Sequence, residues 1–340
     1  MLSVGPGADG SGESAMATSR EARRAYLLLL AMPLFFSSNL VIARAMGDAV
    51  PPFTLALLRW AAAVAILLPF VLSGLREHAG RIIASWRRIA LLGFLGMWIC
   101  GAGVYWALGL TTATNGTLIY TTSPVLVLLI ERFAFGKALP WARLAGVALA
   151  IAGVAVIVLK GDLAALARLD LNLGDLGIAA AALAWAAYSL VLKDERLARI
   201  PTLPLFAAIA IAGVATLLPF SAVELALLGG WPATPRLWIG IAALALFSAV
   251  GAFSLYQYGV KVVGPAVTSC FLYLLPVYGV GMSVAFLGEA FRGHHLAGMA
   301  LVLVGLIAAT APPDIVSSLR HRIAARLPVG GGGAPPSPAP

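Results

Sequence analysis

Long apolar runs follow one another along the chain, and short stretches with charged residues, prolines and glycines separate them. A helix needs about 20 mostly apolar residues to cross the hydrocarbon core of a bilayer, and each run is close to that length. The pattern therefore predicts ten membrane-spanning helices, at roughly residues 25–46, 53–73, 88–109, 112–130, 138–159, 174–192, 203–223, 236–258, 264–287 and 294–312.

Composition indicates an all-α integral membrane protein. Of the 340 residues, 61% are hydrophobic and only 11% are charged, whereas about a quarter of the residues in a soluble domain are charged. This small polar fraction cannot cover a globule in water, so most of the surface must face a lipid bilayer. Soluble protein classes are excluded.

The chain is basic, with 23 Lys and Arg against 14 Asp and Glu. No basic patch is interleaved with aromatic residues, so nucleic acid is excluded as a partner. Short loops with an excess of Lys and Arg mark the cytoplasmic side. Placing the N-terminus inside puts 16 of these residues in inside segments and 4 in outside loops. This predicts a multi-pass protein of the inner cell membrane, with both termini in the cytoplasm.

The two ends of the chain lack the apolar pattern. Residues 1–24 are predicted to form a disordered cytoplasmic tail, and residues 313–340 a second cytoplasmic tail. The first apolar run could also be a signal peptide, because arginines precede it. However, the polar segment Ser37–Asn39 lies in mid-run and another span follows directly, which favours a retained helix.

An internal repeat divides the chain. Gly136–Gly146 reads GKALPWARLAG and Gly288–Gly298 reads GEAFRGHHLAG, 152 positions further along, and the same offset carries Pro124 onto Pro276. Each half then holds five predicted spans. An odd number of spans makes the second half enter the membrane from the opposite side, so the halves are inverted repeats.

The predicted domains follow from this repeat. They are a first five-helix repeat at residues 25–159, an extracytoplasmic linker at 160–173 and a second five-helix repeat at 174–312. Inverted repeats that meet near the bilayer midplane are a construction of secondary transporters, because one site can then open alternately to either side.

The stretch Thr114–Val125, TNGTLIYTTSPV, places seven hydrogen-bonding side chains in a predicted span. Such side chains often bond a neighbouring helix or their own helix backbone. Here, however, Thr114, Thr117 and Thr121 share one helix face with Pro124, and the repeat produces an equivalent face in the ninth span. We therefore expect a substrate-facing surface, with the two prolines as hinges. The paired positions are Thr117 with Ser269, Thr121 with Tyr273, and Pro124 with Pro276.

Further polar and aromatic side chains lie in mid-span. Aromatic stripes in membrane helices often face lipid or the core, which is the alternative interpretation. Together with the polar face they predict an aromatic-lined, mildly polar cavity for a small planar or apolar metabolite. The predicted substrate pathway comprises Asn39, Arg59, Trp98, Tyr105, Thr117, Thr121, Trp185, Tyr188, Gln257, Ser269 and Tyr273.

Arg59 lies deep inside the second predicted span. A charge within the membrane indicates function by default, and a guanidinium can hold a carboxylate through two hydrogen bonds. A structural arginine that bonds helix-end carbonyls is the alternative. No carboxylate lies in mid-span, since Glu131 ends the fourth span and Glu289 begins an outer loop. Uniport or exchange therefore fits at least as well as proton coupling.

Residues for catalysis or metal binding are missing from the spans. Cys100 and Cys270 lie apart in apolar runs. His78 and His321 lie outside the spans, and His294 and His295 lie at the outer end of the last one. We therefore predict no catalytic residue, no metal and no cofactor, and we do not expect an enzyme.

Three ordered motifs resemble the EamA family of the drug/metabolite transporter superfamily: SSNLVIARAM followed by PPFTLALLRW, TNGTLIYTTSPV, and LGEAFRGHHLAG. The resemblance covers about residues 25–312. It implies a permease for small metabolites, often an exporter of amino acids or related compounds, with a central cavity lined by spans 1, 3, 4, 6, 8 and 9. Lys137 departs from the family, which usually has a loop glutamate there. The positions that match recurrent family residues are Asn39, Arg44, Arg59, Pro124, Pro276 and Glu289.

We therefore predict a secondary transporter that moves small-molecule metabolites, amino acids or related compounds, across the inner membrane by alternating access. We expect export, by a monomer or a homodimer. A multidrug or toxic-compound efflux transporter is the alternative, because the same aromatic cavity would serve it. A non-transporting scaffold is a further alternative, and the internal repeat argues against it.

Overall fold

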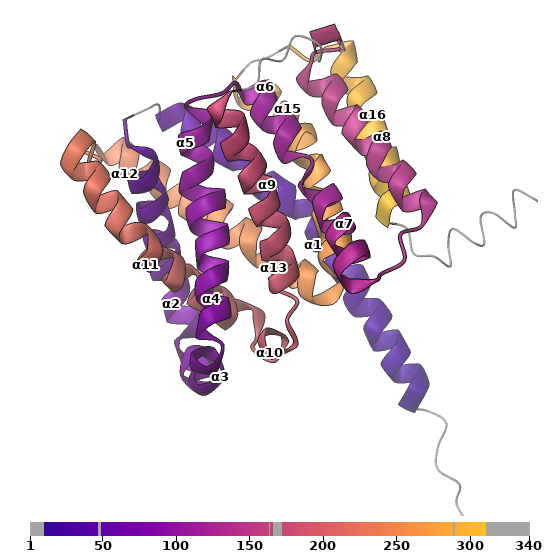
Figure 1. Cartoon of the computed structure of the whole chain (residues 1–340), viewed down its shortest axis with the longest axis horizontal. Helices are drawn as coiled ribbons and strands as arrows, with labels where there is room; N and C mark the ends of the chain where they lie inside the picture. Colours follow the sequence, from indigo (N-terminus) through magenta and orange to yellow (C-terminus); the bar gives the residue numbers. More distant parts are fainter. Residues whose placement is uncertain (1–9, 47–48, 163, 166–171, 288–289, 311–340) are drawn as a thin grey trace, which may run out of the picture.

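The protein is a bundle of long helices that stand side by side, with short helices at their ends (Figure 1). In the described ranges every regular element is a helix. Nine segments within those ranges are long and apolar enough to cross a membrane, and the helix that contains the first predicted span adds a tenth candidate. The all-α membrane class is confirmed. The computed structural model describes residues 10–46, 49–162, 164–165, 172–287 and 290–310.

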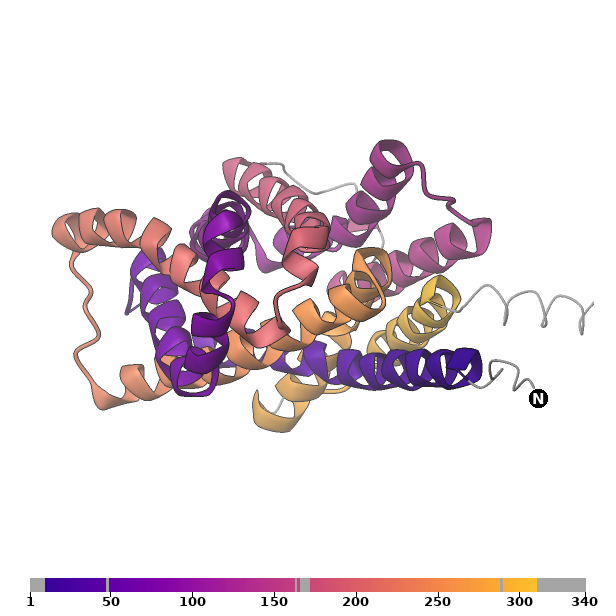
Figure 2. The ribbon, with the colours of Figure 1, turned by 90° about the horizontal axis from the view of Figure 1, so that it is seen from below.

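The first helix, α1 (Gly10–Met46), is the longest, with 37 residues. It begins well before the predicted span at residue 25, because the preceding Ala, Met, Glu and Arg residues favour helix and a helix need not end where the membrane does. It packs against the second half, on α13 (Ala252–Val262), η3 (Leu244–Gly251) and α15 (Leu275–Leu287), and Figure 2 shows its N-terminal part projecting beyond the other helices. Residues 1–9 of the first predicted tail and the whole of the second, residues 313–340, lie outside the described residues.

The remaining helices form two matching series. In the first half these are α2 (Pro52–Glu77), α3 (Ala79–Ala84), α4 (Trp86–Gly93), η1 (Phe94–Gly103), α5 (Val104–Leu108), α6 (Ala113–Tyr120), α7 (Ser123–Phe135) and α8 (Trp141–Val158). In the second half they are α9 (Leu173–Val191), α10 (Glu195–Ala198), α11 (Thr202–Leu228), α12 (Pro235–Ala243), η3, α13, α14 (Pro265–Cys270), η4 (Phe271–Leu274), α15 and α16 (Gly293–Thr310).

Two spans of each half are irregular at matching places. The third and eighth spans contain π-helical segments, η1 and η3. π-Helix is rare in proteins, and where it occurs it is often at a functional site. The fourth span breaks between α6 and α7, just before Pro124, and the ninth passes through the 3₁₀ segment η4 just before Pro276. Proline cannot donate the backbone hydrogen bond that a continuous helix needs, which accounts for both interruptions.

Equivalent helices of the two halves pack antiparallel. A Cβ added to Gly146 of α8 would lie 2.7 Å from the carbonyl oxygen of Gly305 in α16, and one added to Gly153 would lie 2.6 Å from that of Gly298. The repeat carries Gly146 onto Gly298 and Gly153 onto Gly305, so the two contacts are exchanged by the same two-fold relation. Two inverted repeats produce this symmetry.

The second antiparallel pair, α2 and α11, carries a bond between the halves. Both backbone N–H groups at the start of α2 donate to the Glu224 carboxylate of α11, Phe53 N to Oε1 at 3.1 Å and Thr54 N to Oε2 at 2.7 Å. The Thr54 hydroxyl donates to the same Oε2 at 2.9 Å. A carboxylate at a helix N-terminus accepts from otherwise unpaired N–H groups and complements the helix dipole. Glu224 therefore caps α2 from the other repeat.

Replacing Glu224 by Ala should lower the free energy of unfolding by about 1–2 kcal/mol, the usual effect of losing a helix cap. The melting temperature of the purified protein in detergent would measure the loss. Glu77→Ala is the matched control, because Glu77 is an exposed acid at the other end of α2. Equal melting temperatures for both variants would contradict the capping role.

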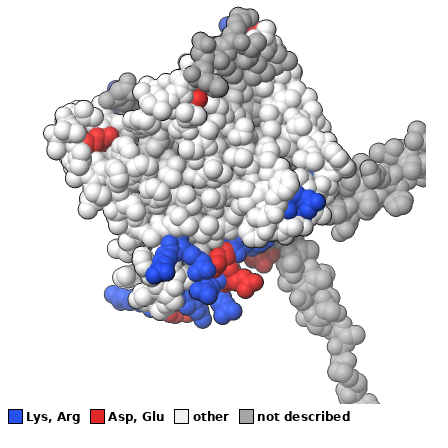
Figure 3. Space-filling view, viewed as in Figure 1, with Lys and Arg blue, Asp and Glu red and all other residues white. Residues whose placement is uncertain are grey.

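Lys and Arg gather at the end of the molecule that carries α3 and α10 (Figure 3). On the face seen there, the middle of the long helices is almost bare of charge, as a lipid-facing surface must be. Exposed basic residues of this end are Arg76, Arg81, Arg87, Lys193, Arg196 and Arg199.

Candidate functional site

A small cavity lies where the two halves meet, with a volume of about 180 Å³. Helices of both halves contribute to its wall, which is mostly apolar with a few polar groups. Sites for small ligands combine these features. The lining residues are Phe36, Asn39, Arg59, Cys100, Val104, Tyr120, Trp185, Ser248, Phe253, Leu272 and Leu275.

Arg59 of α2 is the charged residue in this lining. It is only 4% exposed. Its Nη1 donates to the Tyr105 hydroxyl at 2.8 Å, and that hydroxyl donates to Oδ1 of Asn39 at 2.7 Å. This chain of bonds connects α2, α5 and α1, so Tyr105 and Asn39 fix the position of the guanidinium.

The Arg59 guanidinium has spare hydrogen-bonding capacity. Its Nε has no partner among the described residues, and none of their carboxylates lies within salt-bridge distance of it. The Trp60 and Tyr105 rings lie 4.9 and 5.4 Å from the guanidinium carbon, which compensates part of the charge through cation–π attraction. A buried cation without a counter-ion is costly, so an anionic ligand would be strongly favoured here.

Gly101 keeps the space beside the guanidinium open. It lies in the π-helical segment η1, and a Cβ added there would lie 3.6 Å from Nη2 of Arg59 and 3.4 Å from Nε1 of Trp60. Any larger side chain at Gly101 would occupy the space next to both nitrogen atoms. The glycine therefore leaves space beside the Nη2 edge of the guanidinium.

Aromatic rings form another part of the cavity wall. The Trp185 ring meets Phe36 and Phe253 edge-on, with centroids 5.9 and 5.5 Å apart, and stacks on Tyr188 at 5.4 Å. Edge-on and stacked rings are preferred aromatic arrangements. The wall is thus rigid and apolar, and it suits the body of a small ligand whose charged group lies at Arg59.

A buried polar network of the second half supports this wall. Gln257 Nε2 donates to the Tyr188 hydroxyl at 2.8 Å, and the hydroxyls of Ser189 and Tyr256 lie 2.5 Å apart. All four side chains are buried. Tyr188 and Gln257, two of the predicted pathway residues, therefore contact each other behind Trp185.

The structure brings some predicted pathway residues together and separates others. Asn39, Arg59 and Trp185 line the cavity, and Tyr105 reaches it through Arg59. Trp98 packs among Phe53, Phe94 and Phe220, away from the lining.

The paired polar residues of the fourth and ninth spans lie outside the described cavity lining. The Thr121 hydroxyl donates to the carbonyl of Leu118 at 2.7 Å, and the Ser269 hydroxyl to that of Ala266 at 3.1 Å. Thr117 is half-buried in α6, and Tyr273 is fully buried, with its hydroxyl unbonded among the described residues. None of these four is among the described lining residues.

Several lining residues were not predicted. Tyr120 belongs to the TNGTLIYTTSPV stretch but lies on another face, while Phe36, Cys100, Val104, Leu272 and Leu275 carry no polar signal that distinguishes them from core residues. Ser248 could have been found, because it is a polar residue in the middle of the eighth predicted span.

The predicted hinge at Pro276 adjoins a contact with α1. The Ser37 hydroxyl donates to the carbonyl oxygen of Leu275 at 2.9 Å, directly before the proline. This bond satisfies a backbone acceptor at the irregular turn. Of the other recurrent positions, the Arg44 side chain and Glu289 lie outside the described residues.

Glu131 at the end of α7 is bonded to Lys137. The carboxylate is buried, whereas the lysine is half exposed. Lys137 stands where the EamA resemblance leads one to expect a glutamate, and it supplies the counter-ion of Glu131. This carboxylate therefore lies outside the cavity and carries its own cation.

Comparison with known proteins gives the family. The model of the EamA-like transporter family matches residues 23–159 and again residues 172–311. Two similar proteins of Bacillus subtilis (strain 168) are uncharacterized transporters: YyaM is 24% identical over 84% of this chain and 93% of its own, and YetK is 26% identical over 83% and 85%. An uncharacterized transporter of Archaeoglobus fulgidus is 27% identical over 85% of this chain and 98% of its own.

A solved crystal structure has the same fold, with a TM-score of 0.69 and 25% identity, and the match covers 84% of this chain and 97% of that one. The helical bundle, the cavity between the two halves and the two family matches are consistent with one another. The chain therefore belongs to the EamA-like transporter family.

Proposed function

We propose that this membrane transporter moves small metabolites that carry a carboxylate, amino acids or related compounds, across the inner membrane by alternating access, in the direction of export. The observation that carries the proposal is Arg59, a buried guanidinium that lines the cavity and has no counter-ion among the described residues. A guanidinium matches the geometry of a carboxylate and binds it through two parallel hydrogen bonds.

The place of the cavity supports alternating access. Its lining comes from both halves, so a relative movement of the two inverted repeats would open it to one side or the other. The interruptions before Pro124 and Pro276 are the proposed hinges, because a broken helix bends with little loss of hydrogen bonding.

The basic end supports an orientation with both termini in the cytoplasm. The loops around α3 and α10 carry the gathered Lys and Arg residues of Figure 3, and such loops stay on the cytoplasmic side during insertion. The proposed direction of transport then runs from this end towards the loops that connect α5 with α6 and α11 with α12.

Efflux of cationic drugs is the less favoured function. The aromatic wall would accept a planar compound, but Arg59 would repel a positive charge at short range in a medium of low dielectric constant. The cation in the cavity thus selects for anionic or zwitterionic ligands.

Counterflow in proteoliposomes tests the proposal. Vesicles loaded with an unlabelled amino-acid pool should take up the labelled pool saturably, whereas nucleobase and sugar pools should not exchange. A pH gradient should leave the rate unchanged, because no acidic residue is among the described lining residues. Exchange of cationic dyes without exchange of any carboxylate would overturn the proposal, and protein-free vesicles give the background.

A further inference from the structure

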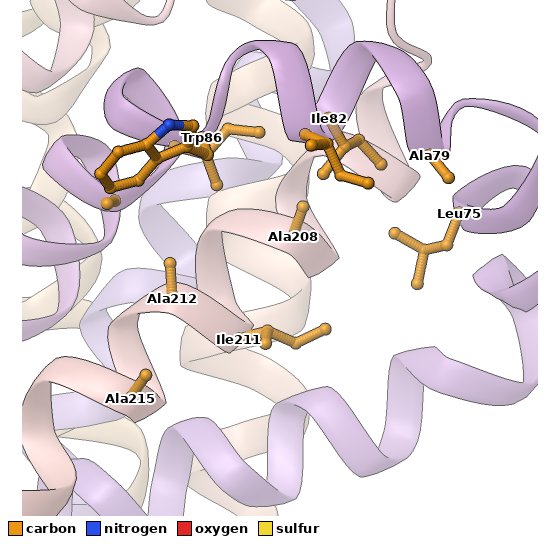
Figure 4. A pocket seen from close by; sticks show the side chains of 11 residues that line it. Leu75, Ala79, Ile82, Trp86, Ala208, Ile211, Ala212 and Ala215 are labelled. Carbon is orange, nitrogen blue, oxygen red and sulfur yellow. The ribbon is translucent and has the colours of Figure 1, made fainter.

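A second hollow lies far from the cavity, on the outer surface at the basic end. It is a groove of about 470 Å³ between α11 on one side and the end of α2, α3 and α4 on the other (Figure 4). Every lining residue in the described part of the chain is apolar. The short helix α3 joins α2 to α4 here, so the groove lies at the level where the chain turns back into the membrane.

The groove forms because small side chains on one wall lie opposite bulky side chains on the other. In Figure 4 the small side chains Ala208, Ala212 and Ala215 of α11 lie opposite the bulky Ile82 and Trp86. Further along, the backbones of α4 and α11 touch, because a Cβ added to Gly93 would lie 2.6 Å from the backbone nitrogen of Gly213. The groove is therefore closed at one end by a tight helix crossing.

The walls of the groove are open to the surroundings. Ile83 is 69% exposed and Trp86 is 60% exposed. In a bilayer this surface contacts acyl chains, and a concave apolar surface holds one chain in more contacts than a flat one does.

Positive charge lies at the same edge. The Arg87 guanidinium carbon lies 5.6 Å from the centroid of the Trp86 ring, which lines the groove. Arg76 follows the lining residue Leu75, and both arginines are exposed. Among the described residues neither has a carboxylate within salt-bridge distance, whereas the neighbouring Arg88 is paired with Asp194 at 2.9 Å.

We propose that this groove is a binding site for an anionic glycerophospholipid, with one acyl chain in the groove and the phosphate at Arg87. Basic groups beside a membrane helix attract anionic headgroups, by roughly a fivefold gain in binding for each residue. A second copy of the chain is disfavoured as the occupant, because a two-fold contact through this groove would add the exposed Arg76 and Arg87 of both copies to one interface. The proposal does not depend on which metabolite is transported.

Native mass spectrometry of the purified protein tests the site, with phosphatidylglycerol and phosphatidylcholine of identical acyl chains as probes. We expect one molecule of phosphatidylglycerol to remain bound under conditions that remove phosphatidylcholine. Arg87→Gln should reduce phosphatidylglycerol binding about fivefold. Arg196→Gln is the matched control, because Arg196 is an exposed arginine on α10 at the same end and should leave binding unchanged.

A second pair of variants tests the groove itself. Ala215→Leu should displace the lipid, because the larger side chain fills the groove, whereas Ala222→Leu adds the same volume at an exposed position of α11 outside the lining. Equal binding of the two lipids, equal losses in Arg87→Gln and Arg196→Gln, or unchanged binding in Ala215→Leu would overturn the proposal. A dimer that Ala215→Leu dissociates would assign the groove to a second copy instead. Melting temperatures without lipid show that the variants are folded.

Discussion

Arg59→Gln is expected to reduce transport of carboxylate-bearing substrates about 10- to 100-fold while the protein stays folded. A hydrogen bond to a charged group contributes about 1.5–3 kcal/mol, and glutamine lacks both the charge and the fork of N–H donors that a carboxylate accepts from. Folding should tolerate the change, because it removes a buried cation with no counter-ion among the described residues. Initial rates in proteoliposomes over a range of substrate concentrations measure the loss.

Arg59→Lys and Arg143→Gln complete this experiment. Lysine keeps the charge but loses the planar fork, so transport should fall between the wild type and Arg59→Gln. Arg143 lies in α8 and donates from Nε to the carbonyl of Ala309 at 3.2 Å, outside the cavity lining, so Arg143→Gln should leave substrate preference unchanged. If Arg59→Gln slowed a neutral substrate as much as an acid, Arg59 would have a structural role and the carboxylate site would be refuted.

Gly305→Ala is expected to lower the free energy of unfolding by about 1–3 kcal/mol, the usual cost of overpacking. The new Cβ would lie 2.5 Å from the backbone nitrogen of Ala150 and 2.6 Å from the carbonyl oxygen of Gly146. Backbone atoms cannot rotate away, so α8 and α16 must move apart and lose the close packing that holds membrane helices together. Intrinsic helix propensity works in the other direction, since Ala is favoured over Gly by about 1 kcal/mol.

Gly281→Ala separates these two effects. Gly281 lies in α15, and a Cβ added there would meet nothing within 4 Å, so only propensity acts and the melting temperature should stay constant or rise. Gly153→Ala should be as destabilising as Gly305→Ala, because the repeat makes the two positions equivalent. A melting temperature of Gly305→Ala equal to that of Gly281→Ala would contradict the tight crossing.

The hydrogen bonds of Arg59 to Tyr105, and of Tyr105 to Asn39, also indicate how a ligand would bind. Tyr105 accepts from the guanidinium and donates to Asn39, so these two residues hold the cation without neutralising it. A carboxylate could then bind Nε and the free edge beside Gly101 without displacing Tyr105. We therefore regard Tyr105 and Asn39 as positioning residues for the proposed site.

The sequence by itself determined the class, the repeat and the buried cation. Burial of twenty-residue apolar runs in a bilayer depends on composition and length alone, so the spans could be predicted without knowing their neighbours. The repeated sequence segments at Gly136–Gly146 and Gly288–Gly298 indicated the two-fold relation between the halves. Arg59 could be singled out because a charge in mid-span is rare whatever surrounds it.

Only the tertiary structure decided which side chains reach the cavity. The prediction for Thr121 assumed one continuous helix, but the fourth span breaks between Tyr120 and Ser123, and a break changes the direction of every side chain beyond it. The π-helical segment η1 acts likewise on the third span, where Cys100 and Val104 line the cavity and Trp98 packs elsewhere. Periodicity along the sequence presupposes a regular helix, and these spans are irregular where they form the site.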